Sequence, residues 1–242
     1  EVVRSWDDEF ANALLEHCGE VRGNRLLKRY RRAFSAAYRE DFLPRTAVRD
    51  IERLEGLDVG GIDMRLYRPL EAPEGLLRLT LFTWDRPLSL SSTLPLLENM
   101  GVQVIQERPY RVLPDRDRPP TIAATRPATS PADIAEREPA DGSRTRGWIH
   151  DFSLQHGEVG ELEADAVRTI FQATLTKAFA GQVDNDGFNR LTLAARLDWR
   201  QVVLLRAYAA YLRQGVLGFS QRYIEDALVG HSSIARRLVK LD

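Results

Sequence analysis

Cysteine is almost absent from this 242-residue chain, since Cys18 is the only one. No disulfide can form within the chain, and a metal site built on cysteines would lack ligands. The four histidines are dispersed, without the i,i+4 or cysteine-paired spacing that zinc ligands show. We therefore expect no metal site, and we expect the reducing cytoplasm as the location of the protein.

Long apolar runs and an excess of one charge are also missing. No run approaches the ~18 consecutive apolar residues that a membrane span requires. The formal net charge of -1 gives no overall field that would attract nucleic acid or an anionic lipid surface, so neither is expected as a partner. Basic residues between Arg25 and Arg32 lie on a predicted helix whose other face is apolar, and they are interpreted as a solvated surface.

The sequence lacks the common catalytic and dinucleotide-binding motifs. No G-x-G-x-x-G, P-loop or G-x-S-x-G sequence occurs, so we expect neither a bound cofactor nor catalysis in this chain. His150 and Asp151 are neighbours on a predicted strand and point to opposite faces, which argues against a catalytic dyad. The first residues include no initiator Met and no apolar signal region, so the chain is expected to begin inside a longer protein.

The sequence DNDG at 184–187 has the composition of a calcium loop. With Gly187 at the sixth loop position, Gln182 and Leu193 occupy the first and twelfth positions, where acidic oxygen ligands are required. The register therefore favours a helix-to-helix turn, in which Asp and Gly supply the turn geometry and a helix cap.

Proline divides the chain into three predicted domains. Six of the twelve prolines lie between Pro114 and Pro139 and none follows, which predicts that the last third is mostly helical. The stretch 115–146 has few large apolar residues and is expected to be mobile and dispensable. The predicted domains are a helical segment at 1–61, an α+β domain at 62–155 with a flexible insertion at 114–146, and a helical domain at 156–242.

Hydrophobic periodicity predicts three short helices within residues 5–56. Ser5 and Asp8 have capping-box spacing, which places the start of the first helix. Pro44 fits the start of the third helix, because the first helical position needs no backbone N–H. Beyond Glu161 the spacing again predicts helices, at 167–178, 191–197, 202–212 and after Ser220, and the stretch 202–212 is apolar nearly all round and is expected to be buried.

The apolar period changes from 3.6 to 2 at Ile62, which predicts a sheet. A helix capped by Ser91 or Ser92, with Pro95 in its first turn, is expected between the second and third strands. The fold class is therefore α+β, with a mainly antiparallel sheet. The predicted strands are 62–67, 77–82, 102–112 and 148–154, and the helix between them runs through Met100.

The stretch LTLFTWDRPLSLSSTLPLLENMGVQVIQERPY at 79–110 resembles an ACT-type regulatory unit, in which a strand, a helix ending in Gly and a second strand follow one another. Further stretches extend the resemblance to nearly the whole chain outside 114–146. Together they resemble the non-catalytic N-terminal region of the large bacterial NAD-specific glutamate dehydrogenases. These stretches are YREDFLPRTAVRDIERLE (38–55), RLYRP (65–69), WIHDF (148–152), DNDGFNRLTLAARLDWRQVVLLRAYAAYLRQ (184–214) and SQRYIEDAL (220–228).

The resemblance implies an ACT-like sheet flanked by helical segments, within a very large cytoplasmic homo-oligomer that oxidises glutamate to 2-oxoglutarate with NAD. NAD and the catalytic domain would lie outside this chain. Two departures from the family pattern are the long insertion and the sequence DRPL at 85–88, which lacks the Gly that many amino-acid-binding ACT units place at this turn.

Polar residues at the start of the predicted helix are candidates for binding an amino-acid effector, since free N–H groups at a helix N-terminus bind carboxylates. The alternative is that the serines only cap the helix. Two functions follow: a regulatory or assembly module that contacts other domains and copies of the enzyme, or a structural connector without a ligand. The candidate residues are Asp85, Arg86, Ser89, Ser91 and Ser92.

Overall fold

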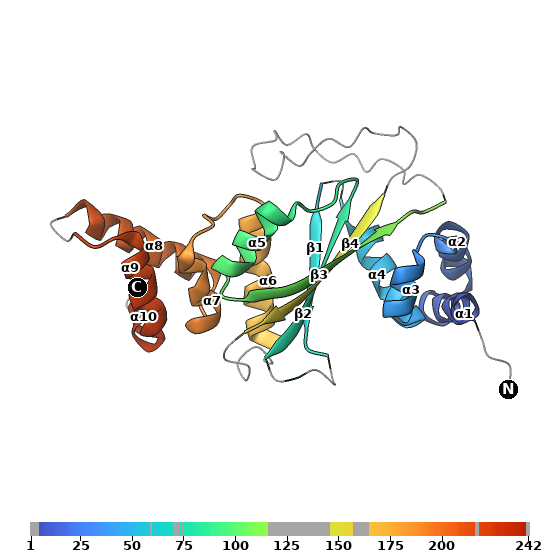
Figure 1. Cartoon of the computed structure of the whole chain (residues 1–242), viewed down its shortest axis with the longest axis horizontal. Helices are drawn as coiled ribbons and strands as arrows, with labels where there is room; N and C mark the ends of the chain where they lie inside the picture. The colour runs from blue at the N-terminus through green and yellow to red at the C-terminus, as the bar shows by residue number, and fades with distance from the viewer. Residues whose placement is uncertain are drawn as a thin grey trace.

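The computed structural model describes residues 5–58, 60–69, 73, 75–115, 146–156, 165–215 and 218–240. In this part of the chain a four-stranded sheet lies between two groups of helices, and a third group extends the molecule at one end (Figure 1). Residues 116–145 of the predicted insertion lie outside the described residues. The strands are β1 (Ile62–Tyr67), β2 (Leu76–Trp84), β3 (Gln103–Val112) and β4 (Gly147–Gln155).

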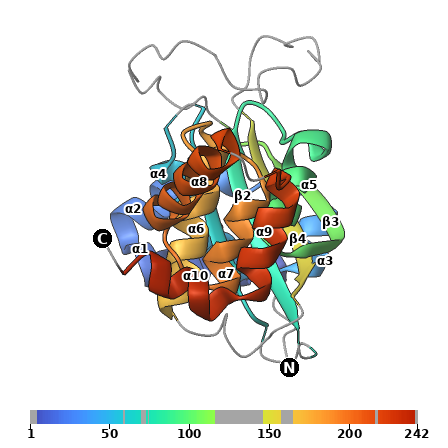
Figure 2. The ribbon, with the colours of Figure 1, turned by 90° about the vertical axis from the view of Figure 1, so that its left-hand side faces the viewer.

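Helices account for most of the remaining described residues. The first group, α1–α4, precedes the sheet in sequence, and the second group, α5 and α6, packs against the sheet. The third group, α7–α10, forms the end of the molecule that faces the viewer in Figure 2. They are α1 (Trp6–Cys18), α2 (Glu20–Tyr30), α3 (Ala36–Asp41), α4 (Pro44–Gly56), α5 (Leu90–Asn99), α6 (Asp165–Phe179), α7 (Leu191–Ala194), α8 (Trp199–Gln214), α9 (Gln221–Gly230) and α10 (Ser232–Leu238), with the short 3-10 helix η3 (Gly187–Arg190) before α7.

The sheet has the strand order β1-β2-β4-β3, and every neighbouring pair is antiparallel. The predicted α+β class with an antiparallel sheet is confirmed. Strands β2 and β3 are joined through α5 and leave room between them for β4, which is a split β-α-β arrangement. This strand order matches that of a ferredoxin-like unit in space. The difference is in the sequence: the edge strand beside β2 is the first strand of this unit, whereas in a ferredoxin-like unit it is the last.

Each face of the sheet is covered by different helices. Helices α1–α4 pack on one face, where Phe82, Ile149 and Val112 are fully buried, whereas α5 and α6 pack on the other face over Leu79 and Phe152. A third core joins η3 and α7–α10 around the buried face of α8. The helices on both faces explain why most residues of β2 and β4 are buried on both sides of the sheet.

The N-terminal region forms four helices where the periodicity predicts three. The predicted capping box is present, since the Ser5 and Asp8 side chains each bond the other's backbone N–H. Pro44 is at the first turn of α4, as predicted. The additional helix is α3, whose start is fixed by Ser35, because its hydroxyl accepts a hydrogen bond from the Tyr38 N–H. A helix of six residues is too short to give a periodic signal.

Helix α5 differs from the prediction at its first turns. Its N-cap is Ser89, and neither Ser91 nor Ser92 occupies that position. The helix begins earlier, at Leu90, so both serines lie within its first turn, where the Ser92 hydroxyl donates to the Ser89 carbonyl at 3.0 Å. Pro95 lies inside the helix, where its missing N–H leaves the carbonyl of exposed Ser91 without a helical donor. Gly101 ends the helix with a left-handed φ of +86°.

The prediction that 202–212 is buried is wrong. Only Val202, Leu205 and Ala209 of α8 face the core, and the opposite side of the helix is open to solvent. An apolar pattern on every side of a helix predicts burial, and here part of that surface has no cover among the described residues. None of the helices described here is both long and apolar enough to span a bilayer.

Candidate functional site at the start of helix α5

The candidate site begins with the turn that connects β2 to α5. Asp85 adopts a left-handed conformation with φ of +68°, and its N–H donates to the Arg146 carbonyl at 2.7 Å. The Arg86 N–H donates to the Trp84 carbonyl at 2.8 Å, and its own carbonyl accepts from the Thr83 hydroxyl at 2.9 Å. Asp tolerates the left-handed region better than most residues, so this turn forms without the glycine expected of an amino-acid-binding ACT unit.

The three candidate serines follow on the first turn of α5. The Ser89 and Ser91 hydroxyls hydrogen-bond to each other at 2.7 Å, and the Ser92 hydroxyl donates to the Ser89 carbonyl. The Ser89 side chain accepts no bond from the helix, so it does not cap it in the usual way. In the described part of the chain nothing accepts from the N–H groups of Leu90 and Ser91, which remain donors for a ligand or water.

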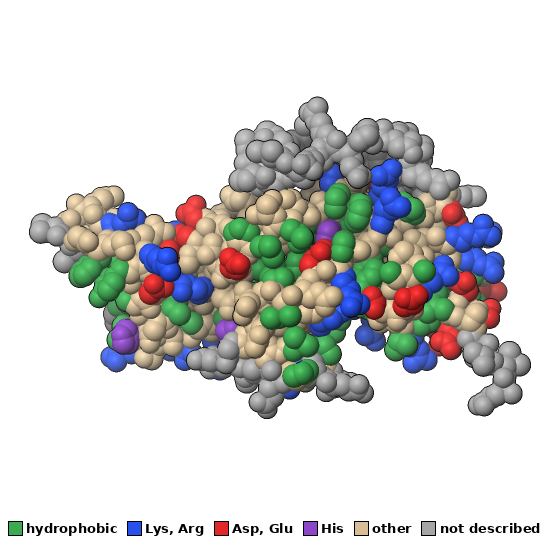
Figure 3. All heavy atoms as spheres, viewed as in Figure 1, with side chains coloured by type: hydrophobic (Ala, Val, Ile, Leu, Met, Phe, Trp, Pro, Cys, Tyr) green, Lys and Arg blue, Asp and Glu red, His purple; other side chains and the backbone are tan. Residues whose placement is uncertain are grey.

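All five predicted residues lie in one short exposed segment, because they are nearly consecutive in sequence. Asp85, Arg86 and Ser91 are exposed, and Ser89 and Ser92 are half-buried. Figure 3 shows this side of the molecule, with hydrophobic side chains gathered over the region of α5. The arrangement offers a positive helix end and a nearby guanidinium, which suits a carboxylate group.

The buried side chain of His150 is hydrogen-bonded to the segment that connects β2 to α5. The Leu88 N–H donates to His150 Nε2 at 3.0 Å, and His150 Nδ1 lies 2.8 Å from a Glu107 carboxylate oxygen. Since a backbone N–H can only donate, Nε2 accepts, and the ring proton is on Nδ1, where it donates to Glu107. Trp148 and Phe152 stack on either side of the ring, with centroids 6.2 and 6.5 Å away.

Sequence reasoning missed this Glu107–His150 pair. The two residues come from neighbouring strands, and their contact follows from the β3–β4 register, in which Pro109 lies opposite His150. The register itself has an irregularity at Val104–Gln106, which no sequence pattern indicates. The alternation of residues along β4 did correctly separate His150 from Asp151.

Asp151 faces the other side of the sheet and is buried there. Its carboxylate accepts from the Arg78 guanidinium and, at 3.3 Å, from the Thr80 hydroxyl. Burial raises the pKa of Asp151 to about 6, although the positive charge of Arg78 acts in the opposite direction. A carboxyl that titrates near neutrality is a common feature of functional sites. Asp151, however, lies on the face of the sheet that α1–α4 cover, and it contacts none of the candidate residues.

Comparison with known proteins decides the family. Models of three glutamate dehydrogenase domains match the chain: helical motif 2 at 13–57, the ACT3 domain at 61–124 and helical motif 3 at 183–241. The whole chain is 40% identical to an NAD-specific glutamate dehydrogenase of Halomonas elongata, 37% to one of Pseudomonas aeruginosa and 35% to one of Mycobacterium tuberculosis. The chain belongs to the NAD-specific glutamate dehydrogenase family. It spans 13% of the length of each of these curated relatives.

The candidate site lies within the ACT3 domain of this glutamate dehydrogenase family chain. The ACT3 match takes in β1, β2, α5 and β3, and the matched helical motif 2 takes in the end of α1 and the whole of α2, α3 and α4. Strand β4, which supplies His150, follows the matched range in sequence and completes the sheet between β2 and β3.

The DNDG sequence lies in helical motif 3 and forms a turn, as predicted. Asp186 caps η3 through a hydrogen bond from the Phe188 N–H at 3.1 Å. The same carboxylate binds Arg206 of α8 and accepts from Gln221 of α9. Among the described residues no three His, Cys, Asp or Glu side chains are grouped to hold a metal ion. In this glutamate dehydrogenase family chain the motif therefore joins helices.

Proposed function

We propose that this chain is a regulatory and assembly region of an NAD-dependent glutamate dehydrogenase. The whole enzyme would oxidise L-glutamate to 2-oxoglutarate in the cytoplasm, as a homo-oligomer. Its NAD and its catalytic residues would come from sequence beyond these 242 residues, since no dinucleotide fingerprint occurs here. The similarity to NAD-specific glutamate dehydrogenases and the match to an ACT domain support this proposal.

One observation carries the assembly role: exposed apolar side chains concentrate on the C-terminal helices. Of the twelve large apolar residues that are exposed in the described part of the chain, eight lie between the start of α8 and the end of α10. Single exposed apolar residues are ordinary, but a group of them marks an interaction surface. We call this group the C-terminal apolar surface: Val203, Tyr208, Tyr211, Leu212, Phe219, Tyr223, Ile234 and Leu238.

Half of the residues in the C-terminal apolar surface are aromatic. Tyr211 is 75% exposed, and the rings of Phe219 and Tyr223 stack on each other with centroids 5.0 Å apart. Tyrosine and phenylalanine are enriched at protein interfaces, because they bury much area at a low entropic cost. Other domains or copies of the same enzyme are the partners we propose for this surface.

The regulatory role is assigned to the start of α5. We propose that an amino-acid effector places its carboxylate at the Leu90 and Ser91 N–H groups, within reach of Arg86. A structural connector without a ligand is the alternative, and the mutual hydrogen bond of Ser89 and Ser91 favours it, because these hydroxyls are already satisfied.

Calorimetry of the chain against a panel of amino acids distinguishes the effector site from the connector. Heat that disappears in Arg86→Gln supports the effector site, and no heat with any amino acid leaves the connector.

The assembly role is tested in the full-length enzyme with Tyr211→Asp. A carboxylate at a packed apolar contact costs several kcal/mol, so the variant should sediment as a smaller species or dissociate at a higher protein concentration. Val21→Asp is the matched control, since Val21 is 89% exposed on α2, outside the C-terminal apolar surface. An unchanged mass and an unchanged effector response in a folded Tyr211→Asp enzyme would contradict the assembly role.

A further inference from the structure

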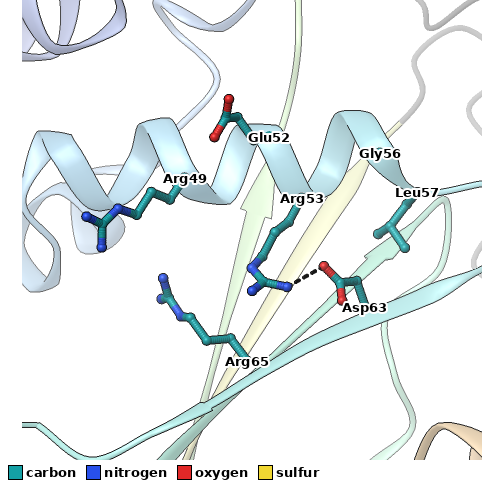
Figure 4. A pocket seen from close by; sticks show the side chains of 7 residues that line it. All are labelled: Arg49, Glu52, Arg53, Gly56, Leu57, Asp63 and Arg65. Carbon is teal, nitrogen blue, oxygen red and sulfur yellow. Dashed lines mark hydrogen bonds and ion pairs between the residues drawn. The ribbon is translucent and has the colours of Figure 1, made fainter. Parts of the chain in front are cut away.

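A groove lies between α4 and β1, outside the candidate site. It is open to solvent, with a volume of about 550 Å³, and arginines dominate its lining. In Figure 4, Arg49 and Arg53 extend from α4 and Arg65 extends from β1 into the same space. Arg45, Arg49 and Arg53 are four residues apart, which places the three on one side of the helix.

Two of these arginines are already paired with carboxylates. Arg53 donates to Asp63 at 2.6 Å and also to the Met64 carbonyl at 3.2 Å. Arg65 lies 3.5 Å from the fully buried carboxylate of Asp50, which also accepts from the Tyr38 hydroxyl at 2.6 Å. These contacts hold the two guanidinium groups in place at the wall of the groove.

The remaining acid of the lining does not neutralise the groove. Glu52 extends from α4 away from the arginines in Figure 4. Its carboxylate instead binds His17 at 2.9 Å and lies 3.7 Å from Arg22, both on the neighbouring helices α1 and α2. Asp63 and Asp50 therefore face three arginines, since Arg49 also acts on the Asp50 charge, and one positive charge is left over at the groove.

Two donors in the groove have no acceptor within the described residues. Arg49 is exposed and forms no hydrogen bond or ion pair there, and the Nε of Arg65 is buried without a hydrogen-bond partner. An unsatisfied buried donor of a charged group is costly, and an anion that accepts from it would remove that cost. Guanidinium groups recognise carboxylate and phosphate oxygens in pairs.

We propose that this groove is a binding site for a small anion with a carboxylate or phosphate group, held by Arg49 and Arg65. Arg53 takes the role of a positioning residue, because its bond to Asp63 fixes the wall of the groove. The lining also includes the apolar side chain of Leu57, which leaves room for a short carbon skeleton beside the charged group. This inference stands apart from the proposed enzyme function, since it rests only on the groove.

Titration calorimetry of the 242-residue chain at low ionic strength tests the site, with inorganic phosphate and 2-oxoglutarate as separate probes. We expect at least one of them to bind, with an affinity that falls as salt is added. Arg49→Gln should weaken binding about tenfold, and Arg49→Lys, which keeps the charge, should weaken it less. Binding of phosphate alone or of 2-oxoglutarate alone identifies which oxyanion the groove accepts.

Arg45→Gln is the matched control, because Arg45 is on the same helix, one turn away, and pairs only at 3.9 Å with exposed Glu16. It should leave the affinity within about twofold. Melting temperatures of all variants show that they are folded. The proposal is overturned if neither probe binds, or if Arg45→Gln weakens binding as much as Arg49→Gln. These results are independent of enzyme mass and effector response, so they separate this site from the assembly role.

Discussion

Arg206 of α8 holds the carboxylate of Asp186 through two parallel hydrogen bonds, from Nε to Oδ2 and from Nη2 to Oδ1, each 2.8 Å long. A third bond joins the same guanidinium to Asn189 at 3.0 Å. Both charged side chains are largely buried, with exposed fractions of 13% and 17%. The pair therefore connects the DNDG turn to α8 at the centre of helical motif 3.

Replacing Arg206 by methionine should destabilise helical motif 3 by about 2–4 kcal/mol, because the buried charge of Asp186 would keep only the neutral donors of Phe188 N–H and Gln221 among the described residues. Denaturant unfolding measures the loss. Arg222→Met is the control, since Arg222 is 90% exposed and lies 3.9 Å from Asp226, and it should change the free energy of unfolding by less than about 0.5 kcal/mol. Equal losses in the two variants would show that the paired geometry contributes nothing.

Gly187 is required by a close approach of side chains to the DNDG turn. A Cβ at this position would overlap the Glu225 carboxylate and lie 2.9 Å from the Arg190 guanidinium. Gly187→Ala should therefore destabilise the chain by about 1 kcal/mol, because the ends of both side chains must shift. Combining it with Glu225→Ala should cost less than the sum of the two single changes, as measured by a double-mutant cycle. Strict additivity would contradict the steric explanation.

The buried ring of His150 is expected to stabilise the turn before α5. In His150→Phe the Leu88 N–H and the Glu107 carboxylate lose their partner, so the free energy of unfolding should fall by about 2–3 kcal/mol. Hydrogen exchange should accelerate at the Leu88 N–H before it changes in α8. Protection of Leu88 that is unchanged in the variant would show that this amide does not depend on the histidine.

Local features could be predicted from the sequence because the residues that make them are close in the chain. The capping box of Ser5 and Asp8, the start of α4 at Pro44, the strand alternation after Ile62 and the turn at DNDG are of this kind. The ACT-like sheet also followed from such signals, together with the resemblance at 79–110. Each depends on a periodicity or a spacing of a few residues.

Contacts between distant elements could not be predicted in the same way. The pairing of Glu107 with His150 depends on a strand register that includes an irregularity, and the arginine groove depends on how α4 lies over β1. The i,i+4 spacing of Arg49 and Arg53 was a signal, but it did not indicate what faces them. The apolar pattern of 202–212 predicts burial without indicating whether the cover comes from this chain, so the expectation was wrong here.

Asp41 and Asp151 should give opposite pH dependences of stability. Hydrogen bonds from Tyr110 and Arg108 lower the pKa of Asp41, so its contribution is present above the ordinary carboxyl range and is lost as the pH falls through its folded value. Burial raises the pKa of Asp151 from 3.8 to about 6, so the folded state binds its proton more tightly than the unfolded state. Only the second group should make the fold more stable on acidification.

The measurement compares denaturant unfolding of the wild type with Asp151→Asn at pH 7.5 and pH 4.5. Between pH 6 and pH 4 the folded protein holds the Asp151 proton and the unfolded chain releases it, so lowering the pH favours the fold. The wild type should therefore gain about 2 kcal/mol relative to Asp151→Asn between pH 7.5 and pH 4.5. The Asp41→Asn comparison should change with the opposite sign, and only below about pH 4, because the pKa of Asp41 is lowered from 3.8 and the carboxylate is protonated in the unfolded chain first. A difference between the wild type and Asp151→Asn that stays constant with pH would show that this carboxyl is not perturbed by burial under the sheet.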